Sequence, residues 1–225
     1  HRNNEAALEF AYGDLAFKTS HPCHFVVTGA PALITIGDAA HHSGSLEHTE
    51  ANQMVNIQTS GHGVYNYLHV AGGIAIPTCL GSRSTSPRER IGGLEGRYLR
   101  DGDILPLGPE SKDYKPLDSI MPSNRHRDTL ALRFIPGFQF DQFSETTRQK
   151  LISQVFSVTP RANRTGIALS GDPVDTGIQA LLSEATCYGA IQIPPDGDPI
   201  VLLNDRQTVG GYPKAGAVIS GDCHR

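Results

Sequence analysis

Hydrophobic residues along this chain gather in short runs that predict β-strands. The runs alternate with polar positions or contain β-branched side chains, and they end at Gly, Pro, Asn or Asp. They occupy residues 25–28, 32–36, 54–57, 64–70, 130–134, 166–169, 190–193 and 200–203. The 24 glycines and 15 prolines fall between them, as tight connections between strands require. The pattern therefore predicts a mainly β protein.

Two segments depart from this pattern and predict short helices. Residues 144–155 begin with Ser144, which can cap a helix, and continue with Glu145 and an amphipathic sequence. Residues 177–183 place Ile178, Leu181 and Leu182 on one helical face. We expect few other helices.

The segment DRQTVGGYPK, at 205–214, has the character of a ligand-binding loop. It follows directly on the apolar run 200–203, and Gly210-Gly211 allows a close approach of the backbone to a ligand. An anion, two cations and neutral hydrogen-bonding groups come from Asp205, Arg206, Gln207, Thr208, Tyr212 and Lys214. The alternative is a solvated β-turn whose charges face water.

A second polar, glycine-rich segment contains GSRST at 81–85 and RERIGGLEGR at 88–97. Its guanidinium groups can bind carboxylate or phosphate through paired hydrogen bonds. The alternative is a surface loop in which the arginines pair with neighbouring acids. The arginines of this segment are Arg83, Arg88, Arg90, Arg97 and Arg100. The residues alone therefore indicate two candidate ligand loops on a β-rich protein.

Charge and composition argue against several classes of partner. The 225 residues carry a formal net charge of −4, and the arginines are interleaved with acids, so we expect no nucleic-acid binding. No apolar stretch of about 18 residues predicts a membrane span, and a cytoplasmic location is the default. The cysteines and histidines lack the spacing of zinc ribbons or helical ligand pairs, so these motifs predict no metal site.

Several motifs taken together resemble one family. They are TGAPALITIGD (28–38), YLHVAGGI (67–74), GSRST (81–85), GGLEGR (92–97), GDILPLG (102–108), RTGIALSG (164–171) and GAIQIPPDGDPIVLLNDRQTVGGYPK (189–214). With these motifs the chain is similar to the family of the 5-oxoprolinase C subunit, also described as the biotin-dependent carboxyltransferase or allophanate hydrolase subunit 2 family. The most specific parts are the block from GSRST to GGLEGR and the block from IQIPPDG to GGYPK.

The resemblance implies a mainly β fold of two cyclophilin-like β-barrel halves with a few short helices. We place the first half at residues 1–110, a connection at 111–127 and the second half at 128–225. GSRST then lies in the first half and GGYPK in the second, and we expect both loops to face one cleft between the halves. Family members usually extend further at both ends, so we expect the chain to be truncated there.

In function, the resemblance implies a subunit of an ATP-dependent 5-oxoprolinase that acts beside subunits A and B. Such an enzyme opens the lactam 5-oxoproline to glutamate, and phosphoryl transfer to the lactam oxygen would make attack by water feasible. No phosphate loop of the form GxxxxGK followed by Ser or Thr occurs in the sequence. We therefore expect ATP, with a divalent metal ion, to be shared with the companion subunits.

This reaction suggests specific roles for the charged residues. We expect Arg206 or Arg83 to bind the substrate carboxylate, and Lys214 to bind a phosphate or a developing oxyanion. Glu184 and Asp205 are candidates for proton transfer or for the metal ion. The predicted catalytic residues are thus Lys214, Asp205 and Glu184.

The neutral residues complete the predicted substrate site. Gln192, Gln207 and Tyr212 are candidates for hydrogen bonds to the lactam. Ser84 either binds the substrate or satisfies the amides of its own loop. The predicted substrate-binding residues are Arg83, Ser84, Arg206, Gln192, Gln207 and Tyr212.

Two other functions are compatible with the same resemblance. The family is similar to the carboxyltransferase part of urea carboxylase, where a carboxyl group moves from biotin to an amide nitrogen, and the biotin would then arrive on another polypeptide. Some relatives are instead non-enzymatic regulators that bind an inhibitor of a histidine kinase. The reaction product separates the first alternative from 5-oxoprolinase activity, and the absence of any turnover would favour the second.

Overall fold

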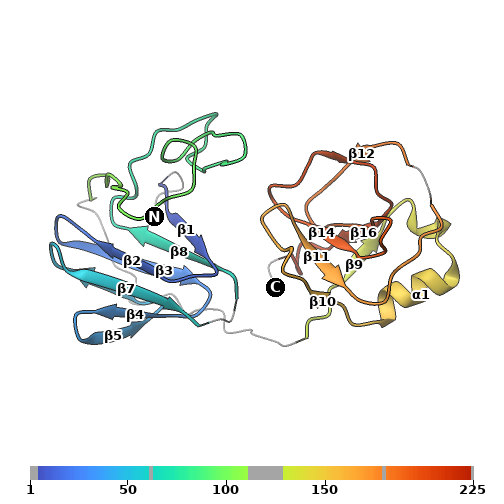
Figure 1. Ribbon diagram of the computed structural model, residues 1–225, viewed down its shortest axis with the longest axis horizontal. Helices are drawn as coiled ribbons and strands as arrows, with labels where there is room; N and C mark the ends of the chain where they lie inside the picture. The colour runs from blue at the N-terminus through green and yellow to red at the C-terminus, as the bar shows by residue number, and fades with distance from the viewer. Residues whose placement is uncertain (1–4, 61–62, 111–128, 179–180, 224–225) are drawn as a thin grey trace. The chain divides into compact units, whose positions relative to one another are not determined.

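A computed structural model describes residues 5–60, 63–110, 129–178 and 181–223. The chain forms two compact units, His1–His126 and Arg127–Arg225, which Figure 1 shows in blue to green and in yellow to red. The prediction of a mainly β protein in two halves is confirmed. The predicted connection at 111–127 lies outside the described residues.

The first unit consists of two four-stranded antiparallel sheets. One has the strand order β1-β8-β3-β6 and the other the order β2-β7-β4-β5. The strands are β1 (Leu8–Ala11), β2 (Leu15–Lys18), β3 (Cys23–Gly29), β4 (Ala32–Ile36), β5 (Ala39–His42), β6 (Leu46–Thr49), β7 (Met54–Thr59) and β8 (Tyr65–Val70).

Alternation along the strands builds the core between these sheets. In β3 the side chains of Phe25 and Val27 are buried, and in β7 those of Val55 and Ile57 are buried. Since successive side chains point to opposite faces of a strand, each sheet directs one apolar face inward. These residues belong to a single core cluster, to which both sheets contribute, and each buried side chain of this size contributes about 1.5–3 kcal/mol.

The second unit is organised around a six-stranded sheet with the order β10-β11-β14-β13-β16-β9, beside a two-stranded sheet, β12-β15. Its core contains Phe143, Val174 and Ile193. The elements are β9 (Phe134–Pro136), the 3-10 helix η1 (Phe140–Gln142), α1 (Glu145–Ser153), β10 (Ser157–Val158), β11 (Gly166–Ser170), β12 (Glu184–Ala185), β13 (Ala190–Gln192), β14 (Ile200–Leu202), β15 (Val209–Gly210) and β16 (Lys214–Val218).

The predicted helix at 144–155 is confirmed as α1. Ser144 is its N-cap, and the Ser144 hydroxyl accepts a hydrogen bond from the Thr147 backbone N–H at 3.1 Å. This contact satisfies one of the amides that the first turn of a helix leaves unpaired. Leu151 anchors the helix in the core of the second unit.

The predicted helix at 177–183 is wrong, because residues 177–178 and 181–183 are not helical. Gly177 has a φ of +68°, in the left-handed region. The Asp175 carboxylate accepts from the Gly177 N–H and the Thr176 hydroxyl accepts from the Ile178 N–H. These local side-chain bonds compete with helical hydrogen bonds.

The strand expected at 130–134 is also displaced. The observed strand β9 begins at Phe134, and residues 130–133 precede it as irregular chain. Arg133 is bound through its backbone N–H and guanidinium to the buried Asp222 carboxylate, at 2.9–3.0 Å. The Asp222 carboxylate thus accepts the hydrogen bond from the Arg133 N–H that a carbonyl of a neighbouring strand would otherwise accept.

Among the described residues, no helix has the length and apolar character needed to cross a membrane.

Candidate active site in the second unit

The second unit brings a lysine and a glutamate together from its two sheets. Lys214 opens β16 and Glu184 opens β12, and Lys214 Nζ lies 2.8 Å from Glu184 Oε2. The Lys214 side chain is 14% exposed and the Glu184 side chain 41%. The Lys214 ammonium, and after it the Gln139 amide, hold the pKa of Glu184 below its usual value in spite of partial desolvation. Glu184 is therefore ionised at neutral pH.

Gln139 is a third member of this group. Its side chain is buried, with 1% of its surface exposed. Gln139 Nε2 donates to both Glu184 oxygens at 2.9 Å. Gln139 Oε1 is buried and has no hydrogen-bond partner in the described part of the chain. An unpaired buried acceptor costs free energy, so a donor that reached this oxygen would be stabilising.

Two more glutamines extend the group, Gln192 in β13 and Gln207 in the chain before β15. Gln192 pairs with Lys214 in the register of β13 and β16, and directly opposed residues place their side chains on the same face. Gln207 Nε2 donates to Gln192 Oε1 at 3.3 Å. Gln192 Nε2 is buried and has no partner among the described residues.

Gly210 makes room for Gln192. A Cβ on Gly210 would lie 2.5 Å from Gln192 Nε2, so the glycine lets the amide reach the backbone of β15. Gly210 also pairs with Glu184 in the β12–β15 register. We call the five side chains the Glu184 cluster: Gln139, Glu184, Gln192, Gln207 and Lys214.

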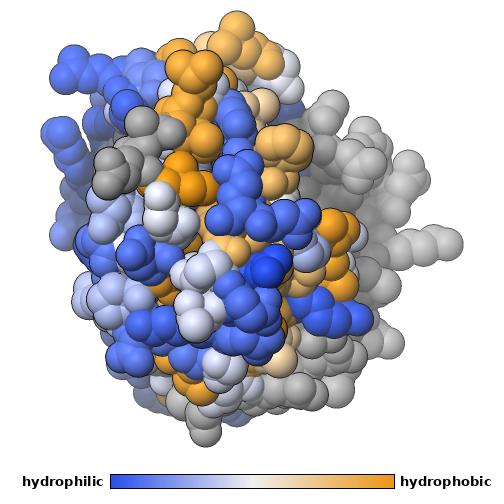
Figure 2. Space-filling view, turned by 90° about the vertical axis from the view of Figure 1, so that its right-hand side faces the viewer, coloured by the Kyte–Doolittle hydropathy of each residue, from blue (hydrophilic) through white to orange (hydrophobic). Residues whose placement is uncertain are grey.

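Large apolar side chains next to the cluster in the sequence are exposed. Phe138 precedes Gln139, Leu182 lies two residues before Glu184, and Val209 and Tyr212 flank the glycine pair. Figure 2 shows apolar and hydrophilic side chains interspersed on one face of the molecule. The polar cluster thus has exposed apolar neighbours along the chain.

The other residues predicted from the loop at 205–214 have different surroundings. Asp205 Oδ2 accepts from Arg164 Nε at 2.7 Å. Arg206 Nη1 donates to the Leu203 carbonyl at 3.3 Å. Tyr212 is partly exposed, at 43%. The roles of Asp205, Arg206 and Tyr212 in a ligand site stay predictions.

Arg83 and Ser84 lie in the first unit, in a loop that glycines close. Arg83 Nε donates to the Ile76 carbonyl at 2.8 Å, and the Ser84 N–H donates to the Ser82 hydroxyl. A Cβ on Gly92 would lie 2.1 Å from the Ser84 carbonyl oxygen, so the absence of a side chain at Gly92 lets the two motifs pack closely together. The substrate roles of Arg83 and Ser84, and the shared cleft, stay predictions.

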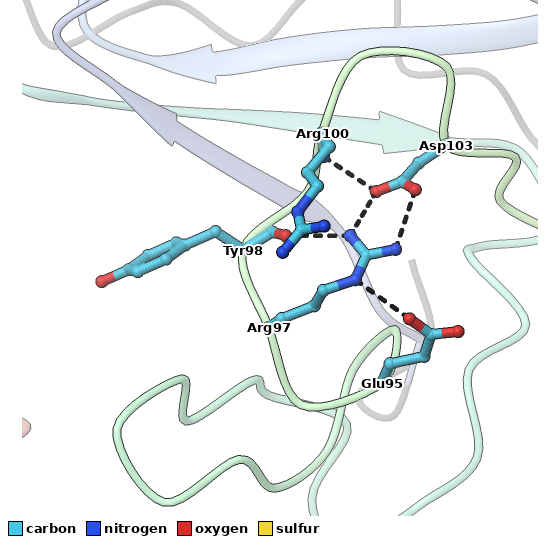
Figure 3. A network of polar contacts seen from close by, with 5 residues as sticks. All are labelled: Glu95, Arg97, Tyr98, Arg100 and Asp103. Atoms are coloured by element: carbon cyan, nitrogen blue, oxygen red, sulfur yellow. Dashed lines mark hydrogen bonds and ion pairs between the residues drawn. The ribbon is translucent and has the colours of Figure 1, made fainter.

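Further along the same loop, Arg97 is held by acids (Figure 3). Its Nη1 and Nη2 donate to the two Asp103 oxygens at 2.7 and 2.9 Å, and its Nε donates to Glu95 at 3.0 Å. The Arg97 guanidinium and then the Arg100 backbone N–H lower the pKa of Asp103 to about 2. For Arg97, the interpretation as a surface arginine paired with neighbouring acids is therefore confirmed.

No group of three or more His, Cys, Asp or Glu side chains that could hold a metal ion occurs among the described residues.

Comparison with known proteins identifies the family. Residues 1–225 match the carboxyltransferase domain, subdomain A and B. The chain belongs to this carboxyltransferase-domain family. The resemblance drawn from the sequence motifs is confirmed.

Within this carboxyltransferase-domain family, a curated relative is the C subunit of 5-oxoprolinase from Escherichia coli K12. It is 34% identical over 98% of this chain and 71% of its own length. The urea amidolyase of Lachancea kluyveri is 27% identical over 72% of this chain and 10% of its own length. The crystal structure of TTHA0988 superimposes with a TM-score of 0.82 at 31% identity, and this chain spans 43% of it.

Sequence reasoning found four members of the Glu184 cluster and missed Gln139. Glu184, Gln192, Gln207 and Lys214 are brought together, although they span three separate strands and a turn. Gln139 stands between Phe138 and Phe140, in a segment without glycine-rich or charged motifs of its own. Its role depends on a contact with a residue 45 positions away, for which the sequence contains no local signal.

Proposed function

We propose that this chain is a subunit of an ATP-dependent 5-oxoprolinase, which opens the lactam ring of 5-oxoproline to give glutamate. The observation that carries the proposal is the Glu184 cluster, where an ion pair lies beside two buried glutamines with unpaired amide atoms. The relationship to the 5-oxoprolinase C subunit of Escherichia coli, over nearly the whole of this chain, supports the same reaction.

The chemistry of the cluster suits a small cyclic amide. A lactam offers one N–H donor and one carbonyl acceptor, and the unpaired atoms are an acceptor, Gln139 Oε1, and a donor, Gln192 Nε2. Groups left unpaired in the protein favour ligands that complete their hydrogen bonds. An aliphatic ring without the amide would leave both atoms unsatisfied.

The ion pair supplies the charged groups that ring opening needs. As water adds to the lactam carbon, negative charge grows on the lactam oxygen, and Lys214 provides a cation to stabilise it. Glu184 is ionised and accepts a proton from the attacking water. The ring C–N bond then breaks, and the released nitrogen takes the proton from Glu184 to become the amino group of glutamate.

The remaining predicted residues belong to the proposal as substrate contacts. Arg206 or Arg83 would bind the substrate carboxylate through paired hydrogen bonds. Ser84, Gln207 and Tyr212 would contribute hydrogen bonds to the same small acid. Asp205 is a further candidate for proton transfer, in competition with its contact to Arg164.

The Glu184 cluster does not fit a triphosphate. Its one cation is already paired with a carboxylate, and the sequence contains no phosphate loop of the form GxxxxGK followed by Ser or Thr. A triphosphate with its metal ion needs several cationic or backbone N–H groups. We therefore propose that the companion subunits A and B provide most of the binding site for ATP and its divalent metal ion. For the complex we propose a cytoplasmic location.

Reconstitution with the two companion subunits tests the proposal. Glutamate release from 5-oxoproline is measured with and without ATP, for the wild-type chain and for Lys214→Ala. We expect ATP-dependent release that Lys214→Ala lowers by about 100- to 1,000-fold, the usual loss when a group that stabilises an oxyanion is removed. Lys18→Ala, on an exposed lysine of β2, is the matched control. Release that Lys214→Ala leaves unchanged would refute the assignment.

A carboxyltransferase acting on urea is the second candidate. The similarity to urea amidolyase of Lachancea kluyveri favours it, and urea also presents N–H and carbonyl groups. In this case, a biotin carried by another polypeptide would donate the carboxyl group. Incorporation of labelled bicarbonate into urea in the presence of such a biotin carrier, without glutamate release from 5-oxoproline, would establish this candidate instead.

A further inference from the structure

Gln139 directs its side-chain amide nitrogen at one carboxylate. Its Nε2 lies 2.9 Å from Glu184 Oε1 and 2.9 Å from Glu184 Oε2. An NH2 group at equal distance from both oxygens centres the carboxylate on the amide nitrogen. Glu184 Oε2 then lies 2.8 Å from Lys214 Nζ.

Glu184 needs such a restraint because its own element is small. Strand β12 contains two residues and pairs only with the two-residue β15 in the described structure. The side chain is also partly exposed. A glutamate in this position has several rotamers available, and holding it in one costs conformational entropy that fixed contacts must offset.

Gln139 is itself fixed to the larger sheet. The Gly137 N–H donates to the Ala215 carbonyl at 2.8 Å, which ties the chain before Gln139 to β16. The Gln139 carbonyl accepts from the Gln142 N–H at 2.9 Å in the turn of η1. Gln139 and Lys214 therefore approach Glu184 from connected parts of one sheet.

We infer that Gln139 is a positioning residue of the candidate active site, which orients the Glu184 carboxylate toward the Lys214 ammonium. An amide suits this task because it donates to the carboxylate and leaves the carboxylate charge in place. A lysine or arginine at this position would neutralise that charge. Leucine would remove the donors, and glutamate would place a second negative charge beside the first. The effect on turnover rests on the proposed function, whereas the effect on Glu184 does not.

The first test measures Glu184 directly. Carbon-13 NMR of the glutamate carboxyl groups in the full chain gives the pKa of Glu184 in wild type and in Gln139→Leu. We expect this pKa to rise in Gln139→Leu, because the hydrogen bonds to the ionised form are lost. Gln149→Leu is the matched control: Gln149 donates to Glu145 on the exposed side of α1, so this change shifts Glu145 and leaves Glu184 unaltered.

The second test uses turnover in the complex with the companion subunits. Gln139→Leu should lower kcat by about 100-fold, the loss expected from a misplaced catalytic group, and Gln149→Leu should leave it unchanged. Gln139→Glu should keep activity where the introduced carboxyl group is protonated and donates to Glu184, and should lose activity as the pH rises and this group ionises. Gln139→Leu should show no such dependence on pH.

The outcomes separate the two ideas. An unchanged Glu184 pKa in Gln139→Leu, or an activity of Gln139→Glu that does not fall as the pH rises, would overturn the positioning role. A raised pKa in a protein whose wild type never releases glutamate would support the positioning role and refute the proposed function. If Gln139→Leu does not fold, Gln139→Met removes the same donors with an unbranched side chain and decides the question.

Discussion

The arginine-rich loop of the first unit and the Glu184 cluster of the second unit are both polar, but they satisfy their polar groups differently. In the loop, Arg97 makes ion pairs with Asp103 and Glu95. In the cluster, the one lysine and one glutamate are paired, while Gln139 Oε1 and Gln192 Nε2 are buried without partners in the described part of the chain.

The difference shows that a high density of charge along the sequence is a poor guide to a ligand site. Charges at a surface pair with one another or with water at little cost. Buried amide atoms without partners are costly, and a protein keeps them where something else completes their hydrogen bonds. The comparison therefore favours the cluster, which has fewer charges than the loop, as the candidate site.

A large predicted effect that sharpens this comparison comes from Gly210→Ala. The new methyl group would lie 2.5 Å from Gln192 Nε2 and displace the amide. We expect glutamate release to fall by about 100-fold and the free energy of unfolding to fall by about 1–3 kcal/mol. Gly221→Ala is the control, because its Cβ would meet nothing within 4 Å. Steady-state kinetics and chemical denaturation of both variants would measure the difference, and equal behaviour would contradict the role of Gly210.

A smaller effect is expected from Arg83→Ala. The change removes the hydrogen bond from Arg83 Nε to the Ile76 carbonyl, which contributes about 0.5–1.5 kcal/mol to folding. If Arg83 also binds the substrate carboxylate, KM for 5-oxoproline should rise about tenfold, the loss of one good ionic contact. Kinetics and chemical denaturation measured on the same variant separate the two roles. An unchanged KM would leave Arg83 a structural residue of its loop.

The smallest effect concerns the pH dependence of the Arg97–Asp103 pair. The pKa of Asp103 is lowered from 3.8 to about 2 in the folded protein, so the pair contributes stability that is fully present above pH 4 and is lost as the pH falls through 2. Asp103→Asn should therefore lower the thermal midpoint at pH 7, and the difference from wild type should shrink between pH 4 and pH 2. A difference that does not vary with pH would show that the ion pair is not its cause.

Much of the fold follows from local patterns in the sequence. The strand predicted at 32–36 is β4, and the cap at Ser144 begins α1, because hydrophobic alternation and helix capping act between near neighbours. The failures at 177–183 and 130–134 also have a common cause. There, side chains of Asp175 and Asp222 take backbone N–H groups that the predicted elements would have used.

The candidate site could be predicted only in part. Gln192, Gln207 and Lys214 lie in or beside a glycine-rich loop with many polar side chains, which predicts them as ligand-binding residues. The contact between Gln139 and Glu184 depends on how two separate sheets pack together. The sequence around either residue gives no sign of this contact. The charge of Asp205 predicts a catalytic role, but its contact with Arg164 depends on a segment that is distant in the sequence.

One measurement tests the central claim most directly: kcat/KM for 5-oxoproline in the reconstituted complex, compared between Lys214→Ala and Arg97→Ala. If the Glu184 cluster carries the chemistry, Lys214→Ala should lower kcat/KM by about 100-fold or more, and Arg97→Ala, in the paired surface loop, by less than about tenfold. Equal losses, or a larger loss from Arg97→Ala, would contradict the account.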